Sequence, residues 1–451
     1  MSTNESKLHI EGNEARNFAK RAARLKQGQQ SEAAAAKFTS LQRLVQLPLF
    51  DEIEAAGGAA RPRDLYGPLA DRLGVEGEGR DATRTSSDGR THNVFEQQVR
   101  WARQTAVMEG LIGGERGRWE LTDAGFEKLG KIRRGKVVMI YSTGDGIALW
   151  AHAEDAAGAI ETGSIKLVLT SPPYPTIDRA YGKMAVPEWL AWMKHLTAIW
   201  KQLLTADGTI AVNLMDVFVK GTPAISPYIE RFTLAAIDDV GLHLAGRMFW
   251  HSPTKLGNIM WTAREKVRPR NSVEQILLFS REPKPAWDIN RMDRPAYSQR
   301  SQSRLERDEA RPASLRPSGY DIAGKAFARR ASGPLPGNLV VAGGAGGTDE
   351  YSKRCRAAGV EPHPARFPAA LPRQVILMTT DVGDVVYDPM AGSNTTGWVA
   401  AGLGRRWLAS EPMRSYVDAS TLRFDHVQHF EGGQFDRNDD ATSRHSFSPR
   451  R

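Results

Sequence analysis

The chain of 451 residues carries 61 Lys and Arg against 52 Asp and Glu, a net charge of +9, and is 41% hydrophobic and 25% charged. This composition is typical of a globular protein of two or three domains and excludes a disordered chain or a fibrous repeat. The sequence contains no run of about 18 apolar residues, the length that would predict a membrane span. A single cysteine excludes a disulfide framework and a cysteine-clustered zinc site, so we expect a cytoplasmic protein without a metal.

The N-terminal third predicts a flexible arm and a small helical domain. Residues 1–37 are polar and carry an alanine run. Residues 38–134 then show the order helix, helix, helix and two-stranded ribbon, with helices expected at Asp64–Leu73 and Phe95–Met108. The polar, Gly-containing stretch 74–89 is expected to be a linker. This order is typical of a winged helix-turn-helix.

The same segment resembles the amino-terminal domain of Mrr-type restriction proteins, through Phe95–Arg103, the Gly-rich turn and Trp119–Gly125. In a winged helix the third helix can enter a DNA groove while the wing meets phosphates. A role in pairing proteins, with a solvated third-helix face, is the alternative. The DNA contacts expected from the third helix and the wing are Arg100, Arg103, Arg116 and Arg118.

Residues 135–424 alternate apolar strands with longer helices, which predicts an open α/β sheet that binds ligands at the carboxyl ends of its strands. A helix is expected over Pro187–Leu204, with an aromatic stripe that indicates core. Strands are expected at Val137–Ile140, Ile165–Leu169, Thr209–Leu214, Leu242–Trp250, Gln275–Phe279, Val385–Tyr387 and Trp407–Ala409.

Two stretches lack this periodicity. Residues 284–360 are rich in Arg, Ser, Pro and Gly and predict an insertion that orders on its target, with Cys355 on its surface. Residues 425–451 predict a disordered tail. Basic residues just before the insertion are expected to contact DNA phosphates: Arg264, Arg268 and Arg270.

The sharpest chemical signal is the end of the strand Ile165–Leu169, where the chain continues as Thr170, Ser171, Pro172, Pro173 and Tyr174. Two prolines fix the backbone and remove two N–H donors, so nearby carbonyls can accept hydrogen bonds. Tyr174 offers a flat face for stacking. Such a loop can hold an exocyclic amino group in plane while a base lies against a ring. The alternative is a proline-rich loop with a packed tyrosine.

A second signal is a glycine-containing loop between a short strand and a helix. Glu411 follows the next strand, where a carboxylate can accept hydrogen bonds from ribose hydroxyls. The loop residues expected to bind a cofactor, together with Glu411, are Asp388, Pro389, Met390, Ala391, Gly392, Ser393, Asn394, Thr395 and Thr396.

Together the two motifs resemble those of the amino-directed DNA methyltransferases, which use S-adenosylmethionine. The catalytic motif precedes the cofactor loop, which is the permuted order of the beta class, and the resemblance covers about residues 137–416. It implies a Rossmann-like sheet, target recognition by residues 284–360, and further cofactor contacts from Asp145, His363, Phe367 and Pro368. Two positions depart from the family pattern: Met390 replaces an aromatic residue and Asn394 a glycine. Asn tolerates positive φ, so the turn can survive.

Serine in the first catalytic position resembles the cytosine-N4 enzymes, and Ser171 can accept a hydrogen bond from the target amino group. The expected function is therefore sequence-specific N4 methylation of cytosine in duplex DNA by base flipping. C5 methylation is excluded because Cys355 lies outside any Pro-Cys setting. The alternatives are adenine-N6 methylation and a DNA-binding regulator with a decayed methyltransferase domain. A restriction–modification setting, a cognate endonuclease and a homodimer stay open.

Overall fold

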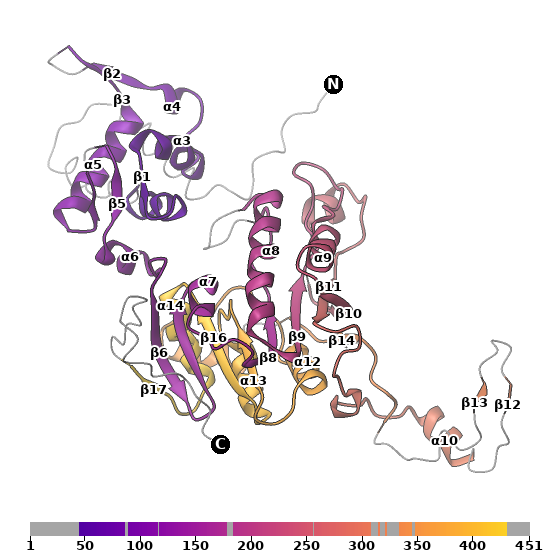
Figure 1. The fold of residues 1–451 in the computed structure, drawn as a ribbon. Helices are drawn as coiled ribbons and strands as arrows, with labels where there is room; N and C mark the ends of the chain where they lie inside the picture. Colours follow the sequence, from indigo (N-terminus) through magenta and orange to yellow (C-terminus); the bar gives the residue numbers. More distant parts are fainter. Residues whose placement is uncertain are drawn as a thin grey trace. The chain divides into compact units, whose positions relative to one another are not determined.

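The computed structural model describes residues 45–85, 89–115, 117–177, 184–255, 257–307, 314–315, 321–322, 333–344 and 348–430. The chain separates into two compact units, Met1–Lys136 and Val137–Arg451 (Figure 1). The predicted arm, Arg116 and most of the predicted tail lie outside the described residues. Within the described part, no helix is long and apolar enough to cross a membrane.

The first unit packs its helices against a small sheet with strand order β1-β5-β4. A helix runs through residues 45–55, and the side chains of Leu49, Leu69 and Val99 are fully buried at the centre of the unit. This arrangement is the predicted winged helix. Its elements are β1 (Ala59–Ala60), α3 (Pro62–Arg72), α4 (Glu78–Asp81), β2 (Thr83–Thr85), β3 (Thr91–Asn93), α5 (Val94–Met108), β4 (Ile112–Gly113), β5 (Trp119–Leu121) and α6 (Asp123–Leu129).

The stretch expected to be a linker is more ordered than predicted. It contains α4 and β2, and β2 pairs antiparallel with β3. The side chain of Asn93 then caps α5 by accepting a hydrogen bond from the Glu96 backbone N–H at 3.0 Å. The strand β2 is exposed throughout. It therefore shows no apolar alternation that could have revealed it.

In the second unit, ten described strands form one mixed sheet with the order β14-β10-β11-β9-β8-β15-β16-β7-β6-β17. Its centre is parallel: β8 pairs with β9 and β15, and β16 pairs with β15 and β7. The strands are β6 (Val137–Thr143), β7 (Gly146–Ala151), β8 (Ile165–Thr170), β9 (Leu204–Leu214), β10 (His243–His251), β11 (Val273–Ser280), β14 (Leu339–Val341), β15 (Val385–Asp388), β16 (Arg406–Glu411) and β17 (Gln428–His429).

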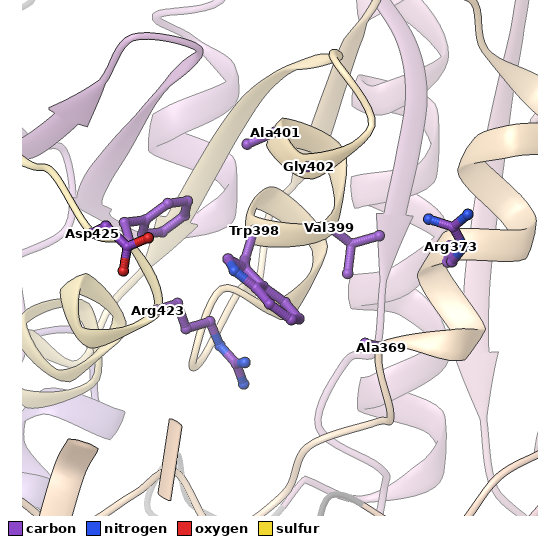
Figure 2. A pocket seen from close by; sticks show the side chains of 9 residues that line it. Ala369, Arg373, Trp398, Val399, Ala401, Gly402, Arg423 and Asp425 are labelled. Carbon is purple, nitrogen blue, oxygen red and sulfur yellow. The ribbon is translucent and has the colours of Figure 1, made fainter. Parts of the chain in front are cut away.

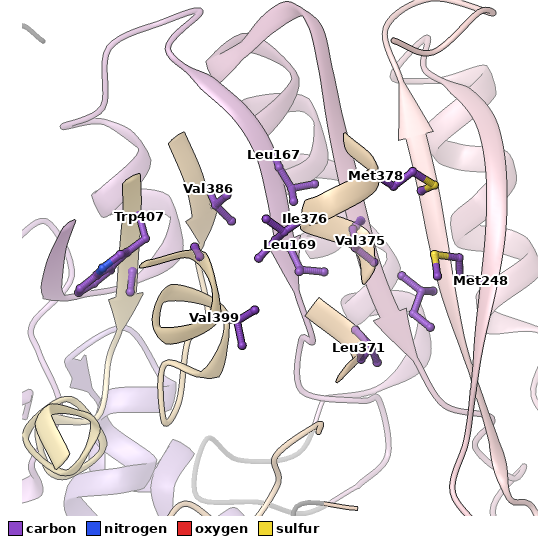
Figure 3. Close-up of a cluster of buried hydrophobic side chains, with 14 of the residues drawn as sticks. Leu167, Leu169, Met248, Leu371, Val375, Ile376, Met378, Val386, Val399 and Trp407 are labelled. Atoms are coloured by element: carbon purple, nitrogen blue, oxygen red, sulfur yellow. The ribbon is translucent and has the colours of Figure 1, made fainter. Parts of the chain in front are cut away.

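Helices cover both faces of this sheet. On one face Trp189 packs against Tyr228 and Phe232, with ring centroids 5.0 and 5.6 Å away. On the other face Leu371, Val375 and Val399 meet the central strands (Figure 3). The remaining elements are α7 (Ala153–Ala157), α8 (Val186–Leu203), α9 (Tyr228–Asp238), η1 (Met260–Arg264), η2 (Ile289–Arg291), α10 (Gln299–Arg307), β12 (Ser314–Leu315), β13 (Asp321–Ile322), α11 (Glu350–Ala357), α12 (Ala370–Thr379), α13 (Thr395–Gly402), α14 (Arg414–Ser420) and η4 (Thr421–Arg423).

The strand β8 explains why the site forms where it does. All six of its residues are buried, because Leu167 and Leu169 face one helical layer while Val168 faces the other. The parallel strands β8, β9, β15 and β16 all end at one edge of the sheet, here called the carboxyl edge. Thr170, Leu214, Asp388 and Glu411 are their last residues.

Three predictions about the irregular stretches need correction. Both ends of the insertion belong to the core: Met292 is buried there, and β14 pairs in parallel with β10. Cys355, expected on the surface, is fully buried in α11. The predicted tail begins with an ordered strand, because β17 pairs with β6. In each case few apolar residues are buried, so the sequence shows no clear period.

Candidate active site

The catalytic motif leaves β8 at the carboxyl edge and is held there by side-chain hydrogen bonds. The Trp189 indole donates to the Pro173 carbonyl at 2.7 Å. The Tyr174 hydroxyl donates to Glu274 Oε2 at 2.9 Å and lies 3.2 Å from Ser171 Oγ. Ser171 itself is half-buried. The loop is therefore rigid, with its serine beside the sheet edge.

Tyr174 has two ends in different surroundings. Its hydroxyl lies deep among polar groups, and burial together with the nearby Glu274 carboxylate raises the pKa of Tyr174 well above its ordinary value. The hydroxyl therefore stays protonated at neutral pH. The residue as a whole remains partly exposed. A ring anchored in this way can still present a face to a base.

The cofactor loop begins where β15 ends, next to the catalytic motif. Asp388 is buried and accepts hydrogen bonds from Thr396 Oγ1 at 2.6 Å and from the Met390 backbone N–H at 3.2 Å. Glu411, at the end of β16, accepts from the Gly392 N–H at 3.0 Å and from the Met413 N–H at 2.9 Å. Parallel pairing of β8, β15 and β16 thus brings both predicted motifs to one edge.

The departure at Asn394 is accommodated as expected. Its backbone is left-handed, with φ 52° and ψ 44°, which Asn adopts at less cost than most residues. Its side chain accepts from the Gly397 N–H at 3.0 Å and so caps α13. Its amide also donates to the Tyr141 hydroxyl at 3.1 Å. The other departure, Met390, is partly buried against the core around α8.

His363, Phe367 and Pro368 lie at the same edge, because they precede α12, which runs back toward the start of β15. The closest approach is at Gly392, whose φ is +51°. A Cβ added there would lie 3.0 Å from His363 Nε2. The His363 ring stands edge-on to Tyr416 with centroids 4.3 Å apart. The histidine ring therefore packs directly on the backbone of the cofactor loop.

Asp145 is misplaced by the sequence prediction. It lies in the turn between β6 and β7, and Gly146 pairs with Trp407 at the start of β16, whereas Trp150 pairs with Glu411 at its end. Four residues of strand, about 13 Å, separate it from the carboxyl edge. The Gly-Asp pair marks a hairpin turn here. Glu154, whose carboxylate accepts from the Trp192 indole at 2.7 Å, follows β7 at the carboxyl edge instead.

The sequence did not predict the side chains that hold the cofactor loop in place through hydrogen bonds. Arg423 donates to the Ser393 carbonyl at 2.5 Å and to Ser393 Oγ at 2.8 Å. Its guanidinium and that of Arg366 lie 4.2 and 5.0 Å from the ring centroid of Tyr351. Burial lowers the pKa of Arg423 to about 10, so it stays charged at neutral pH. Arg423 follows the last strand predicted from the sequence, Trp407–Ala409, in a stretch that carries no motif.

The predicted DNA-binding arginines of the second unit differ in availability. They lie in the connection from β10 to β11, which leaves the sheet at the carboxyl edge because β10 runs parallel to β9 through the intervening β11. Arg264 and Arg270 are exposed. Arg268 is tied down instead, since it donates to the Pro223 carbonyl and lies 5.2 Å from the Phe218 ring centroid.

The predicted DNA-binding arginines of the winged helix also divide into exposed ones and one that is held by another side chain. Arg118 is exposed, and Arg100 is exposed with an ion pair to Glu96 at 3.5 Å. Arg103 is only partly exposed, and its guanidinium lies 5.9 Å from the Trp119 ring centroid. Arg116 lies outside the described residues.

A hollow of about 400 Å³ lies away from the motifs, on the outer side of α12 and α13 (Figure 2). None of Ser171, Asp388 or Glu411 lines it, so we do not assign it to the reaction. Its lining consists of Ala369, Arg373, Trp398, Val399, Ala401, Gly402, Arg423, Phe424 and Asp425.

Known families match both units. The DNA methylase family matches residues 165–422, and the Mrr N-terminal domain matches residues 44–131. The chain belongs to the DNA methylase family. The methylase is 35% identical to the type II methyltransferase M.PvuII of Proteus hauseri over 287 residues, 63% of this chain and 85% of that protein.

Two further matches have a lower identity or a shorter matched region. The solved structure of the PvuII DNA methyltransferase (cytosine-N4-specific) superposes on the methylase with a TM-score of 0.50 and 28% identity, covering 66% of this chain and 89% of that one. The DNA adenine methyltransferase YhdJ of Escherichia coli (strain K12) is 40% identical over 70 residues, 16% of this chain and 24% of that protein. The predicted family, fold class and Mrr-like domain are confirmed.

The methylase uses S-adenosylmethionine, and the carboxyl edge fits that cofactor. Gly392 has no side chain, so its backbone lies at the loop surface in contact with the His363 ring. Glu411 presents a buried carboxylate at the end of β16, where ribose hydroxyls are commonly held. The cofactor supplies a methyl group on a positively charged sulfur.

Asp388 gives the site a measurable pH dependence. Burial raises its pKa to about 6, so its charge destabilises the folded protein by about 3 kcal/mol above that pH. This cost disappears as the pH falls from about 6 to about 4. We expect Asp388→Asn to remove it, so that the stability of the variant relative to wild type is about 2 kcal/mol greater at about pH 7.5 than at about pH 4.5. Thermal unfolding at both pH values measures this.

The exposed Asp145→Asn is the matched control, since its side chain stays in water. A stability difference between Asp388→Asn and wild type that does not change with pH would contradict a buried, charged Asp388.

Proposed function

We propose that the methylase transfers a methyl group from S-adenosylmethionine to the N4 amino group of cytosine in duplex DNA. The observation that carries this is Ser171 at the carboxyl edge, beside the cofactor loop, in a chain that spans most of a cytosine-N4 relative. A serine hydroxyl can accept a hydrogen bond from an amino group without being a strong base. Attack by the neutral amino nitrogen, with the proton lost afterwards, follows from that chemistry.

The chain's own residues would mainly position the reactants. Ser171 Oγ would accept one amino N–H, and the Pro172 carbonyl would accept the other. The Tyr174 ring would stack on the base, which must leave the duplex to reach it. On the cofactor side, Glu411 would accept from the ribose hydroxyls while Gly392 and His363 enclose the cofactor. Holding the two partners in line supplies most of the rate.

The direct test is the identity of the product. Unmethylated genomic DNA is incubated with the protein and S-adenosylmethionine, digested to nucleosides and analysed by mass spectrometry. N4-methylcytosine is the expected product. N6-methyladenine alone would overturn the base assignment, and unmethylated DNA together with no calorimetric binding of the cofactor would favour the decayed regulator.

We also propose that duplex DNA is held by both units, with residues 284–360 reading its sequence. The exposed Arg118, Arg264 and Arg270 are suited to phosphates, since they lack the anchoring contacts of Arg103 and Arg268. A restriction–modification role predicts that DNA from cells making the protein resists a cognate endonuclease. The homodimer and the cytoplasmic location are expectations from the sequence.

The salt dependence of DNA binding tests the winged-helix assignment. We expect Arg118→Ala to weaken binding of every sequence alike and to lower the slope of log affinity against log salt by about 1, because one phosphate contact is lost. Arg103→Ala is the contrasting variant: it should lower the melting temperature of the first unit through loss of the Trp119 contact. Fluorescence anisotropy at several salt concentrations measures the slope. An unchanged slope for Arg118→Ala would favour the protein-pairing role.

A further inference from the structure

A buried carboxylate lies directly behind the catalytic loop. Glu274, the second residue of β11, is only 6% exposed. Its Oε2 accepts from the Tyr174 hydroxyl at 2.9 Å and from Asn213 Nδ2 at 2.7 Å, and its Oε1 accepts from Lys255 Nζ at 2.5 Å. The donors come from the catalytic loop, from β9 and from the connection after β10. A buried charge is tolerated because an ammonium and two further donors compensate it.

This carboxylate fixes the direction of a chain of hydrogen bonds. A carboxylate only accepts, so the single hydroxyl proton of Tyr174 is committed to Glu274. The contact of 3.2 Å between Ser171 Oγ and the Tyr174 hydroxyl oxygen must then be donated by Ser171. The alternative acceptor for the Ser171 proton is the backbone carbonyl oxygen of Asn213, which is farther away, at 3.5 Å from Ser171 Oγ. Either way, Tyr174 cannot donate to Ser171. Asn213 Nδ2 lies 3.4 Å from Ser171 Oγ and can donate to one of its lone pairs, and the other stays available for a substrate amino group.

We propose that Glu274 is the positioning residue that makes Ser171 a hydrogen-bond acceptor and that takes up, through Tyr174, the proton released by the methylated amino group. The proposal deepens the proposed function, on which it rests. It requires an amino group as methyl acceptor but not a particular base.

The proton balance is complete within this chain of groups. After methyl transfer the substrate nitrogen bears the new N–CH₃ bond, a positive charge and one proton too many. One N–H bond breaks as that proton passes to Ser171 Oγ, the Ser171 proton passes to the Tyr174 oxygen, and the Tyr174 proton passes to Glu274 Oε2. Ser171 and Tyr174 end as neutral hydroxyls and Glu274 as a neutral acid, which later releases the proton to water.

Glu274→Gln tests the direction directly. The new amide can donate to the Tyr174 oxygen, which frees the Tyr174 proton to point at Ser171 and occupy its lone pair. We expect the single-turnover rate of methyl transfer to fall about 100-fold, the usual size for a lost proton-transfer group, with cofactor and DNA dissociation constants within about threefold of wild type. Glu282→Gln, an exposed glutamate just beyond β11, is the matched control.

Tyr174→Phe keeps the ring and removes the link. We expect Tyr174→Phe to lower the rate as much as Glu274→Gln does. The rate of the double variant should lie within about threefold of either single variant, because each change breaks the same chain of hydrogen bonds. Independent, multiplying losses would overturn the proposal. A Glu274→Gln rate within about threefold of wild type would also overturn it. So would a rate loss accompanied by a lower melting temperature and a cofactor affinity weakened by a similar factor.

A readout without turnover completes the test. With tyrosines labelled at the ring carbon that bears the hydroxyl, the NMR signal missing from Tyr174→Phe identifies Tyr174. That signal should shift in Glu274→Gln and stay in place in Glu282→Gln; an unchanged position in both would contradict the hydrogen bond. If the wild-type product is N6-methyladenine, the base assignment fails while the comparison of variants remains valid.

Discussion

Ser171→Ala should lower the rate of methyl transfer by about 100-fold or more while leaving cofactor affinity unchanged. The alanine keeps the backbone of the loop, whose position is set by the Trp189 contact to Pro173 rather than by the serine. It removes the acceptor that would orient the amino group toward the cofactor. Losing one preorganised polar contact at a reacting centre typically has an effect of this size. Single-turnover kinetics with labelled cofactor measure the rate, and calorimetry measures the affinity.

The matched control is Ser164→Ala, just before the other end of β8, where Oγ donates to the Glu161 carbonyl at 2.6 Å in a turn. It should leave the rate unchanged. An active Ser171→Ala, or one that loses cofactor affinity as strongly as rate, would contradict the role assigned to Ser171.

Gly392→Ala should weaken cofactor binding by about tenfold or more. Its φ of +51° is a conformation that costs an alanine about 1–2 kcal/mol, and the added Cβ would lie 3.0 Å from His363 Nε2. The imidazole and the loop backbone must then move apart, which distorts the loop assigned to the cofactor. In the free variant the loop can relax out of this conformation, so cofactor binding must restore it, and about 1.4 kcal/mol corresponds to a factor of ten in the dissociation constant. Calorimetric titration with S-adenosylmethionine measures the change.

Gly402→Ala provides the comparison, because Gly402 ends the adjacent helix α13 and an added Cβ meets nothing within 4 Å. Its cofactor affinity should equal that of wild type. Equal affinities for Gly392→Ala and wild type would place the contact between Gly392 and His363 outside the cofactor site.

The two motifs could be placed from the sequence because each follows a buried strand. Runs such as Leu167–Leu169 predict a parallel sheet, and residues just beyond parallel strands meet at one edge. Asp145 shows the limit of this reasoning, since a Gly-Asp pair after an apolar run also marks a hairpin turn. Only the pairing of β6 with β7 decides between the two.

The network around Glu274 illustrates a second limit. Asn213 and Glu274 are buried polar residues beside the apolar runs of their strands, and this is the signal that could have drawn attention to them. Their partners Tyr174 and Lys255 lie far away in the chain, so no spacing predicts the contacts. Cys355 was misplaced for a related reason: α11 buries only Tyr351, Ser352 and Cys355 among charged neighbours.

The boundaries of the insertion have a consequence for how such a protein can change. Arg294 donates to the Gly333 carbonyl at 3.0 Å, and Gly333 lies so close to Pro295 that a Cβ would fall 2.0 Å from its carbonyl oxygen. The chain therefore leaves the core and returns to it at neighbouring points. Recombination could replace the segment between these two points as one piece, at almost any length, while the sheet and both motifs stay as they are. Under the proposal that this segment reads the target sequence, specificity and chemistry can evolve separately in one chain.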